Sequence, residues 1–359
     1  MQWRAKNKLL RAAAAVPFLL ISAHCSIAME PSKLFEQWQP ALDSGVIEWE
    51  GGSIPLRTTF YHVELLDWYW RGLTITFAPA TLGYDPVAWW TGFEFLSQLV
   101  PLYSTWVLES YSLASETTPK RLPFLFMFLG QAFGTGVIVP VFHFLCFVLG
   151  PSPTYSKITG MKKDDRIRGH SQSQPVSLLL SPMLFIYLSI WGAFLAQRLE
   201  ARHMFVWSWF LTPVWSGIAE TLLTRLVSVL GYPKPGRSAR RLREVQLILL
   251  TGIAMGAWVY MSSRAGFSLS TIFMPDGFAH NDLILHSRFV WQSDFMSTFG
   301  STILFLVYEH IELYSSGLLD QSQWFWIAMF PVIAFLVGPG AAAALIWIAK
   351  ERNMRKGFC

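Results

Sequence analysis

The sequence predicts an all-α integral membrane protein, a helical bundle of seven or eight transmembrane helices. Three observations lead to this fold class. Of the 359 residues, 53% are hydrophobic and only 14% are charged, and the mean hydropathy of +0.37 lies above that of ordinary soluble domains. Aromatic residues make up 16% of the chain. Apolar stretches of roughly 20 residues, the length that crosses a bilayer, recur along it.

Residues 1–29 have the layout of a targeting sequence. Four basic residues precede an apolar stretch from Ala12 to Ile21, and small residues follow. This pattern predicts a signal peptide. Because the apolar stretch with its flanks is almost long enough to span a bilayer, an uncleaved signal anchor is the alternative. Either one directs residues 30–60, which are polar and acidic, to the lumen as a small N-terminal segment.

Residues 61–350 are predicted to form one polytopic membrane domain, followed by a basic tail at 351–359. Basic loops near 157–168 and 234–243 are expected on the cytosolic side, because Lys and Arg concentrate there. The expected location is the endoplasmic reticulum membrane, with several passes and with lipid as a partner. The predicted spans are 62–80, 87–109, 122–149, 176–196, 204–230, 245–262, 289–310 and 323–349.

Composition and motifs exclude several classes of function. The net charge of +5 fits cytosolic loops of a membrane protein better than a nucleic-acid surface, so no nucleic acid is expected as a partner. The cysteines form no Cys-x-x-Cys pair, and Asn281-Asp282 lacks the second carboxylate of a Mg²⁺-diphosphate motif. No His-Glu-x-x-His, Gly-x-Ser-x-Gly or in-span histidine pair occurs. We therefore expect neither a metal nor a cofactor.

Ionisable residues within the predicted spans are the candidate catalytic groups. Such a residue costs at least ~2.5 kcal/mol inside a bilayer, so it normally faces the protein interior and often marks function. A hydrogen bond to a neighbouring span, or an ion pair at a span end, is the alternative explanation for each of them. The candidate acids are Asp294 and Glu94, deep in their spans, with Glu109, Glu64 and Asp67 completing a polar cluster.

Aromatic residues gather beside these charges. A carboxylic acid that is held protonated in an apolar site and surrounded by ring faces suits one chemistry, the protonation of a hydrocarbon and the stabilisation of the resulting carbocation. The alternative is that the rings only pack within the membrane or form interfacial belts. The candidate substrate-binding residues are Arg71, which would tune the acids, and Trp68, Trp90, Trp215 and Trp291.

Three segments carry a resemblance to a known family. They are Leu-Leu-Asp-Trp-Tyr-Trp-Arg-Gly at 65–72, Phe-Ala-Pro-Ala-Thr-Leu-Gly-Tyr-Asp-Pro at 77–86 and Trp-Val-Leu-Glu-Ser at 106–110. The chain resembles the fungal integral membrane terpene cyclases of meroterpenoid pathways, such as the ascochlorin, ascofuranone and macrophorin cyclases. The resemblance covers most of residues 60–310, including Gln131, Gly134 and Pro140.

The resemblance implies a metal-independent cyclase of secondary metabolism. Its substrate would be a small prenylated, farnesyl-type molecule with an aromatic or cyclohexenone head. An acid would protonate a terminal epoxide or alkene, and the chain would then close through a series of cations. One departure stands out, because the family pattern leads us to expect a carboxylate at position 98, where this chain has Gln98, with Glu94 one turn earlier.

Two other classes of function stay open at this stage. The first is a membrane transporter for a small organic molecule or for protons, which discontinuous helices and repeated halves would favour. The chain has prolines within predicted spans but no matching halves. The second is a membrane scaffold or lipid-binding protein without catalytic activity, in which all the buried acids would be paired and would tolerate neutralisation.

Overall fold

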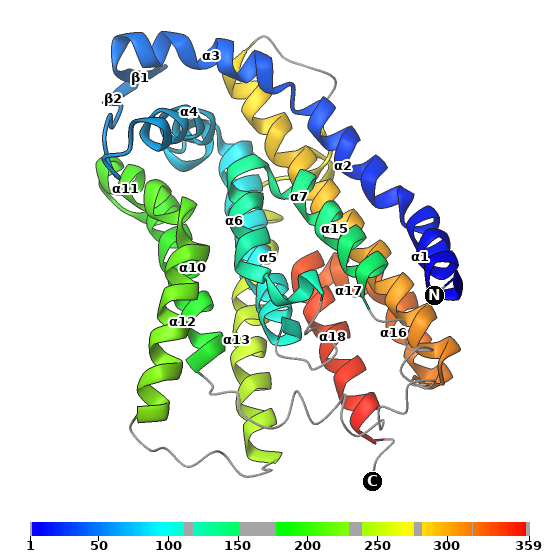
Figure 1. Cartoon of the computed structure of the whole chain (residues 1–359). Helices are drawn as coiled ribbons and strands as arrows, with labels where there is room; N and C mark the ends of the chain where they lie inside the picture. The colour runs from blue at the N-terminus through cyan, green and yellow to red at the C-terminus, as the bar shows by residue number, and fades with distance from the viewer. Residues whose placement is uncertain are drawn as a thin grey trace.

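The computed structural model describes residues 2–110, 118–150, 177–229, 239–275, 282–317 and 319–356. The all-α prediction is confirmed, because these residues form helices with short connections and a single β-hairpin (Figure 1). In chain order the elements are α1 (Gln2–Ala14), α2 (Val16–Ala28), α3 (Pro31–Ser44), β1 (Val46–Trp49), β2 (Gly52–Pro55), α4 (Glu64–Thr81), α5 (Pro86–Ser110), η2 (Pro119–Arg121), α6 (Pro123–Phe133), α7 (Thr135–Leu149), α10 (Ser177–Leu195), α11 (Leu199–Phe210), α12 (Thr212–Val229), α13 (Ala239–Ser263), α14 (Leu269–Phe273), α15 (Leu283–Ser315), η3 (Gln321–Gln323), α16 (Trp324–Ala328), α17 (Phe330–Val337) and α18 (Pro339–Lys356).

Helix α5 is the central element of the assembly. It packs against α4, α10, α13, α15 and α18, and almost all of its side chains are buried. A helix that is apolar on every side must be covered on every side to remove that surface from water. The other helices therefore surround α5, and the cavities described below lie against it.

Gln98 joins α5 to three segments that are distant in sequence. Its side-chain amide nitrogen donates to the carbonyl oxygens of Gly256 (3.0 Å) and Val337 (3.1 Å), and its amide oxygen accepts from the backbone N–H of Ala341 (2.8 Å). The residue is fully buried. A carboxylate has no N–H to donate, so glutamine rather than an acid suits this position.

The N-terminal helices α1 and α2 lie along one edge of the molecule, beside α7 and α15 (Figure 1). The Ser22 hydroxyl donates to the carbonyl oxygen of Val137 (2.8 Å), and the Arg11 guanidinium forms an ion pair with Glu312 (2.9 Å). The segment whose composition predicts a signal peptide or anchor thus packs as part of the helix assembly in this structure.

Residues 31–55 form a small cap over α4. The indole N–H of Trp38 on α3 donates to the Thr76 hydroxyl on α4 (2.8 Å). The antiparallel hairpin pairs Ile47 with Ile54, and both side chains are buried. These strands were not predicted, although Ile47-Glu48-Trp49-Glu50 alternates apolar and polar residues and Gly51-Gly52 follows as a turn signal.

The predicted membrane topology is not supported. None of the described helices is, taken singly, both long enough and apolar enough to cross a bilayer. One bent pair, Lys8–Ala14 with Val16–Ser44, passes the criterion on length and composition together, with a bend of 42°. This finding does not support seven or eight spans, and it contradicts a multi-pass location in the endoplasmic reticulum membrane.

Breaks within the apolar stretches shorten some of the predicted spans, whereas α5, α13 and α15 are at least as long as the spans predicted there. The predicted span 122–149 is divided at Gly134 into helices of 11 and 15 residues, and 323–349 is divided among α16, α17 and α18. A bilayer crossing needs roughly 20 continuous residues. Composition averaged over a stretch does not register such a break, so the apolar pattern overestimated helix length in these two stretches.

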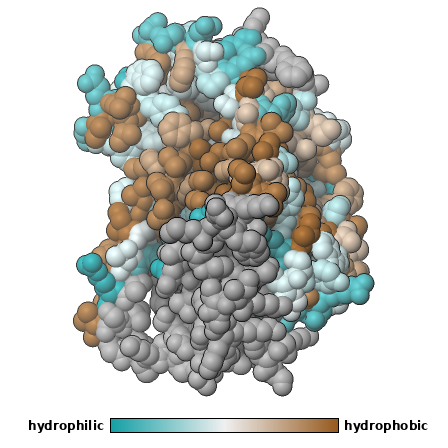
Figure 2. Space-filling model, turned by 45° about the vertical axis from the view of Figure 1, so that its right-hand side comes forward, coloured by the Kyte–Doolittle hydropathy of each residue, from teal (hydrophilic) through white to brown (hydrophobic). Residues whose placement is uncertain are grey.

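Much of the surface is apolar. Figure 2 shows a broad band of hydrophobic residues across the middle of one face, with hydrophilic residues above it and on both flanks below it. Among the large exposed hydrophobic side chains of the described residues are Leu65, Leu222 and Met261, each at least 60% exposed. A contiguous apolar surface of this breadth is typical of one that another molecule covers.

Parts of the predicted topology fall outside the described residues. These are the basic loop at 157–168, residues 234–238 of the second basic loop, Asn281, and residues 357–359 of the tail. Residues 351–356 of the predicted tail continue helix α18.

Replacing Gln98 by leucine should destabilise the fold, because it leaves buried backbone groups of three segments without their partner. Each of the three groups costs about 1–3 kcal/mol, so we expect a loss of about 3 kcal/mol or more in the free energy of unfolding. Thermal unfolding of Gln98→Leu measures it, with Gln197→Leu at an exposed position as the control. Equal unfolding temperatures for the two variants would show that Gln98 does not hold these segments together.

Candidate functional site

A cavity of about 250 Å³ lies between α3, α4, α5, α6 and α15. We call it the Asp294 cavity, after the ionised side chain in its lining. Most of its wall is apolar and aromatic. The rings that line it include Trp38, Tyr69, Phe77, Phe95, Trp209 and Trp291. Ligand sites for small organic molecules combine such walls with a few fixed polar groups.

The Asp294 carboxylate lies at the N-terminus of helix α7. One oxygen, Oδ1, accepts from the backbone N–H of Gly136 (2.5 Å). The other, Oδ2, accepts from the backbone N–H (3.2 Å) and the hydroxyl (3.0 Å) of Thr135. The first amides of a helix have no partner within the helix and favour a negative charge. Helix α7 therefore stabilises the ionised form of Asp294.

The break between α6 and α7 creates this arrangement. Gly134 has φ +93°, a conformation that L side chains rarely adopt. A side chain there would also contact Met29 and Asp294, since a methyl carbon would lie 3.2 Å from Asp294 Oδ1. Glycine at position 134 thus ends α6, starts α7 and directs two N–H groups at the carboxylate.

Burial and hydrogen bonding act in opposite directions on Asp294. Burial raises the pKa of the carboxyl, and the hydrogen bonds from Gly136 and Thr135 lower it, with a net rise from 3.8 to about 6. A carboxyl whose pKa lies near neutral pH exchanges protons readily under ordinary conditions. The Asp294 cavity therefore combines an apolar binding space with one group suited to proton transfer.

Helix α2 forms the wall behind the carboxylate. A methyl carbon at position 136 would lie 2.8 Å from Cys25 Sγ and 2.9 Å from the Asp294 backbone, so Gly136 allows α2, α7 and α15 to meet. Met29, just after α2, lines the cavity itself. Its carbonyl oxygen lies 3.0 Å from Nε2 of His286 on α15.

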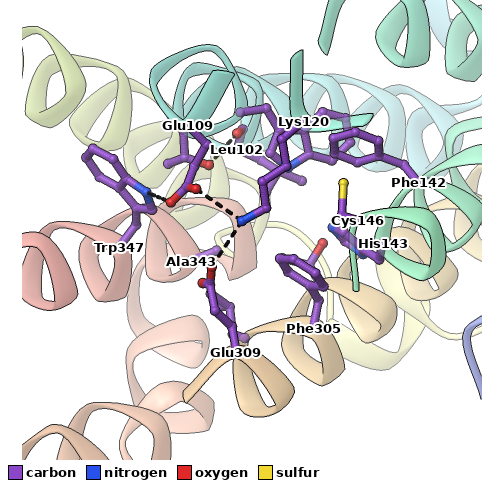
Figure 3. A pocket seen from close by; sticks show the side chains of 14 residues that line it. Leu102, Glu109, Lys120, Phe142, His143, Cys146, Phe305, Glu309, Ala343 and Trp347 are labelled. Atoms are coloured by element: carbon purple, nitrogen blue, oxygen red, sulfur yellow. Dashed lines mark hydrogen bonds and ion pairs between the residues drawn. The ribbon is translucent and has the colours of Figure 1, made fainter. Parts of the chain in front are cut away.

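A second, smaller cavity lies against the other half of α5, α7 and α15 (Figure 3). Its volume is about 40 Å³, which suits one or two water molecules and not an organic substrate. Figure 3 shows Lys120 reaching between Glu109 and Glu309, with Cys146 and His143 to one side.

Four ionised side chains form a closed ring at this second cavity. Lys120 Nζ lies 3.1 Å from both Glu109 and Glu309, and Lys350 Nζ lies 2.9 Å and 2.8 Å from the same two carboxylates. The indole N–H of Trp347 donates to Glu109 (2.8 Å). We call Glu109, Lys120, Glu309 and Lys350 the ion-pair ring.

The ring is electrically neutral and its members satisfy one another. Burial opposes ionisation of Glu309, but the two ammonium groups hold its pKa at about 2. The same contacts raise the pKa of both lysines, so Glu309 and both lysines stay charged. A group fixed in one charge state is a poor acid or base near pH 7. The ring therefore has the character of a structural element that joins α5, η2, α15 and α18.

The structure does not bring the predicted catalytic residues together. Asp294 lines the larger cavity, and Glu109 belongs to the ion-pair ring. Glu94 is fully buried and lines neither cavity, and its two oxygens have no hydrogen-bond partner among the described residues. Burial raises its pKa well above 4.5. Glu64 is exposed at the start of α4. Asp67 is buried and accepts from two backbone N–H groups of the preceding loop.

The predicted substrate-binding residues are also separated. Only Trp291 lines the Asp294 cavity. Arg71 donates to the Asp67 carbonyl oxygen (3.2 Å), and Trp68 stacks on Phe35 at the surface. Trp90 and Trp215 lie elsewhere. The first packs edge-on against Trp89, and the second is 41% exposed.

Several important residues were not identified from the sequence. Thr135 and Gly136 hold Asp294, and the signal for them was the Gly-Thr-Gly run at 134–136 inside an apolar stretch. Lys120 and Lys350 were not among the predicted site residues, although Lys350 is only 2% exposed. No periodicity of the sequence indicates that residues so far apart would meet.

Comparison with known protein families gives a match to the CtvD domain over residues 34–354. The chain belongs to the CtvD domain family. It is also similar to a FAD-dependent monooxygenase, verC1, of Penicillium polonicum, with 25% identity over 363 residues, 98% of this chain and 43% of that protein. A second relative, the FAD-dependent monooxygenase BOA8 of Botryotinia fuckeliana, is 21% identical over 272 residues, 73% of this chain and 34% of that protein. No solved structure matches.

These relatives correct the functional prediction. The chain spans less than half the length of the curated relatives it matches. Because both are named as FAD-dependent monooxygenases, the predicted metal-independent terpene cyclase and the alternative of a transporter are wrong. Family and relatives agree with a protein of a fungal pathway that handles a small molecule, and they do not support a membrane lipid as partner.

Replacing Lys350 by methionine should destabilise the protein by about 3–5 kcal/mol, because it leaves two buried carboxylates with a single cation. Chemical unfolding measures the loss. The matched control is Lys33→Met, which removes a more exposed ion pair with Glu30 and should cost less than about 1 kcal/mol. The double variant Lys350→Met, Glu309→Gln should recover part of the stability. A loss for Lys350→Met no larger than for Lys33→Met would show that the ring is not structural.

Replacing Gly136 by alanine should push α2 away from Asp294. Overpacking of this kind costs about 1–3 kcal/mol. The control is Gly300→Ala on α15, where a methyl group meets nothing within 4 Å, and which should be neutral or stabilise the helix. Thermal unfolding compares the two variants, and a stable Gly136→Ala would contradict the close meeting of α2, α7 and α15.

Proposed function

We propose that the chain is the part of a flavin-dependent oxygenation system of fungal secondary metabolism that binds the organic substrate and moves a proton. The relatives supply the type of reaction, since both are named FAD-dependent monooxygenases. The Asp294 cavity supplies the binding space and the proton-transferring group. The observation that carries the proposal is the Asp294 carboxyl, held in an aromatic cavity with a pKa of about 6.

The Asp294 cavity does not suit FAD itself. A dinucleotide diphosphate is normally held by backbone amides at a helix N-terminus that follows a strand of a parallel sheet. The only β-sheet among the described residues is a two-stranded antiparallel hairpin, so no parallel sheet is present there. Of the two helix N-termini at the cavity, that of α7 is already occupied by the Asp294 carboxylate, and that of α3 begins with Pro31, which has no N–H to donate. A diphosphate there would meet a negative charge and no arginine or lysine of the cavity lining.

The flavin is therefore assigned to another part of the system. More than half of each relative lies outside its match with this chain, which leaves room there for a nucleotide-binding domain. In the system of this chain, the flavin would be held by such a domain or by a separate protein.

The cavity lining indicates the substrate class. Aromatic and aliphatic side chains form most of the wall, and the ionisable group among the lining residues that stays poised near neutral pH is Asp294. A mainly apolar molecule with an acidic hydroxyl group at one end, phenolic or enolic, would bury its apolar part against the rings and present the hydroxyl to the carboxylate.

Asp294 then acts as a base. Its carboxylate accepts the hydroxyl proton of the substrate, so that the O–H bond breaks and its electron pair stays on the substrate oxygen. Electron density rises at the neighbouring carbon framework, which prepares it for oxidation. The backbone N–H groups of Thr135 and Gly136 hold the carboxylate in a fixed position for this proton transfer.

Replacing Asp294 by asparagine should lower product formation by about 100-fold or more, the usual contribution of a general base. The variant replaces the chain in the producing organism, and mass spectrometry of extracts shows whether the substrate accumulates. Asp43→Asn, at an exposed position on α3, is the control. The rate with the unaltered chain should fall as the pH drops through about 6, because the carboxylate becomes protonated. Full product formation by Asp294→Asn would rule out the proposed role.

A further inference from the structure

A line of hydroxyl groups leads from Asp294 through Thr135, at the cavity wall, to Thr298, which is not part of the lining. The Thr135 hydroxyl donates to Asp294 Oδ2 (3.0 Å), and the Thr298 hydroxyl donates to the Thr135 oxygen (3.2 Å). Thr298 is fully buried and Thr135 is 2% exposed. Thr298 stands one turn after Asp294 on α15, so both side chains face α7.

The order of donation is fixed by the chemistry of the three groups. An ionised carboxylate only accepts, so Thr135 must direct its single hydroxyl hydrogen at Asp294. The Thr135 oxygen is then free to accept, and Thr298 supplies the hydrogen. Hydrogen bonds in such a line polarise one another, so a hydroxyl that accepts a bond donates a stronger one.

We propose that Thr298 is a positioning residue that acts on Asp294 through Thr135. It holds the Thr135 hydroxyl in the one orientation that donates to the carboxylate and strengthens that donation. The role rests on the proposed function of Asp294 as a base. It adds a residue that touches neither the cavity nor the carboxylate, since Thr298 is absent from the cavity lining.

Other groups around Asp294 do not compete for this role. The titratable side chains that act on it from the neighbouring elements are Cys25 on α2 and Tyr103 on α5. Burial raises the pKa of both, that of Cys25 to about 12, so both stay neutral in the pH range where Asp294 titrates. A change in the titration of Asp294 can thus be attributed to the hydroxyl line.

The test is a carboxyl-carbon NMR titration of the full chain with labelled aspartate, with Asp294→Asn used to assign the signal. Thr135→Val removes the direct hydroxyl donor and should raise the pKa of Asp294 by about one pH unit. Thr298→Val removes only the second hydroxyl and should raise it by about 0.3 pH unit. Thr298→Ser keeps the hydroxyl and should restore the original value.

Thr302→Val is the matched control. Thr302 lies one turn further along α15, and its hydroxyl donates only to the Thr298 carbonyl oxygen (2.8 Å). Its replacement should leave the pKa of Asp294 unchanged. No change in Thr298→Val, or an equal change in Thr302→Val, would overturn the positioning role.

The titration and the assay of product formation separate the two proposals. If the pKa of Asp294 rises in Thr298→Val while Asp294→Asn still forms product, the hydroxyl line is real and the proposed function fails. If Asp294→Asn is inactive but the pKa of Asp294 is unchanged in Thr298→Val, the role of Asp294 as a base is supported and the positioning role of Thr298 is rejected.

Discussion

The contact between the Asp294 carboxylate and the first amides of α7 determines how the larger cavity is built. It links α15 to α7 at the break after Gly134. Because Gly136 has no side chain, α2 can pack closely behind the carboxylate and complete the wall of the cavity. Without the carboxylate, the start of α7 would bury amide groups that have no partner, which costs about 1–3 kcal/mol for each group. The charged group thus serves the fold and the chemistry at once.

The surroundings of three buried carboxyl groups give them different pKa values. Asp294 meets dipoles and no cation, so its pKa stays near 6 and its protonation state can change. Glu309 meets two ammonium groups, so its pKa is held at about 2 and it stays ionised. Glu94 meets neither, and burial favours its protonated form. Of these three, only Asp294 lies beside a cavity of substrate size.

The sequence indicated the helical class and drew attention to Asp294, because an ionisable residue in an apolar stretch is costly unless it is paired or has a function. It did not show the breaks at Gly134 and Gly338, since apolar composition continues across both, and the two spans predicted there were therefore too long. Glu94 and Glu109 stand on the same helix, yet 15 residues at 1.5 Å each place them about 22 Å apart, in different surroundings. Grouping them as one cluster required a tertiary arrangement that helical spacing excludes. Lys350 directly precedes the predicted basic tail and was not predicted as a site residue, although its partners in space are two glutamates.

The ion-pair ring also constrains the order in which the chain can fold. Its members Glu109 and Lys350 lie 241 residues apart, so the ring closes only after α18 has been made and has docked. Until then Glu109, Lys120 and Glu309 would carry an uncompensated negative charge into an apolar interior, which strongly disfavours burial. The half of the bundle around the smaller cavity must therefore stay open and hydrated during synthesis. The interior around the smaller cavity is complete only once α18 has docked, and the chain is exposed to aggregation until then.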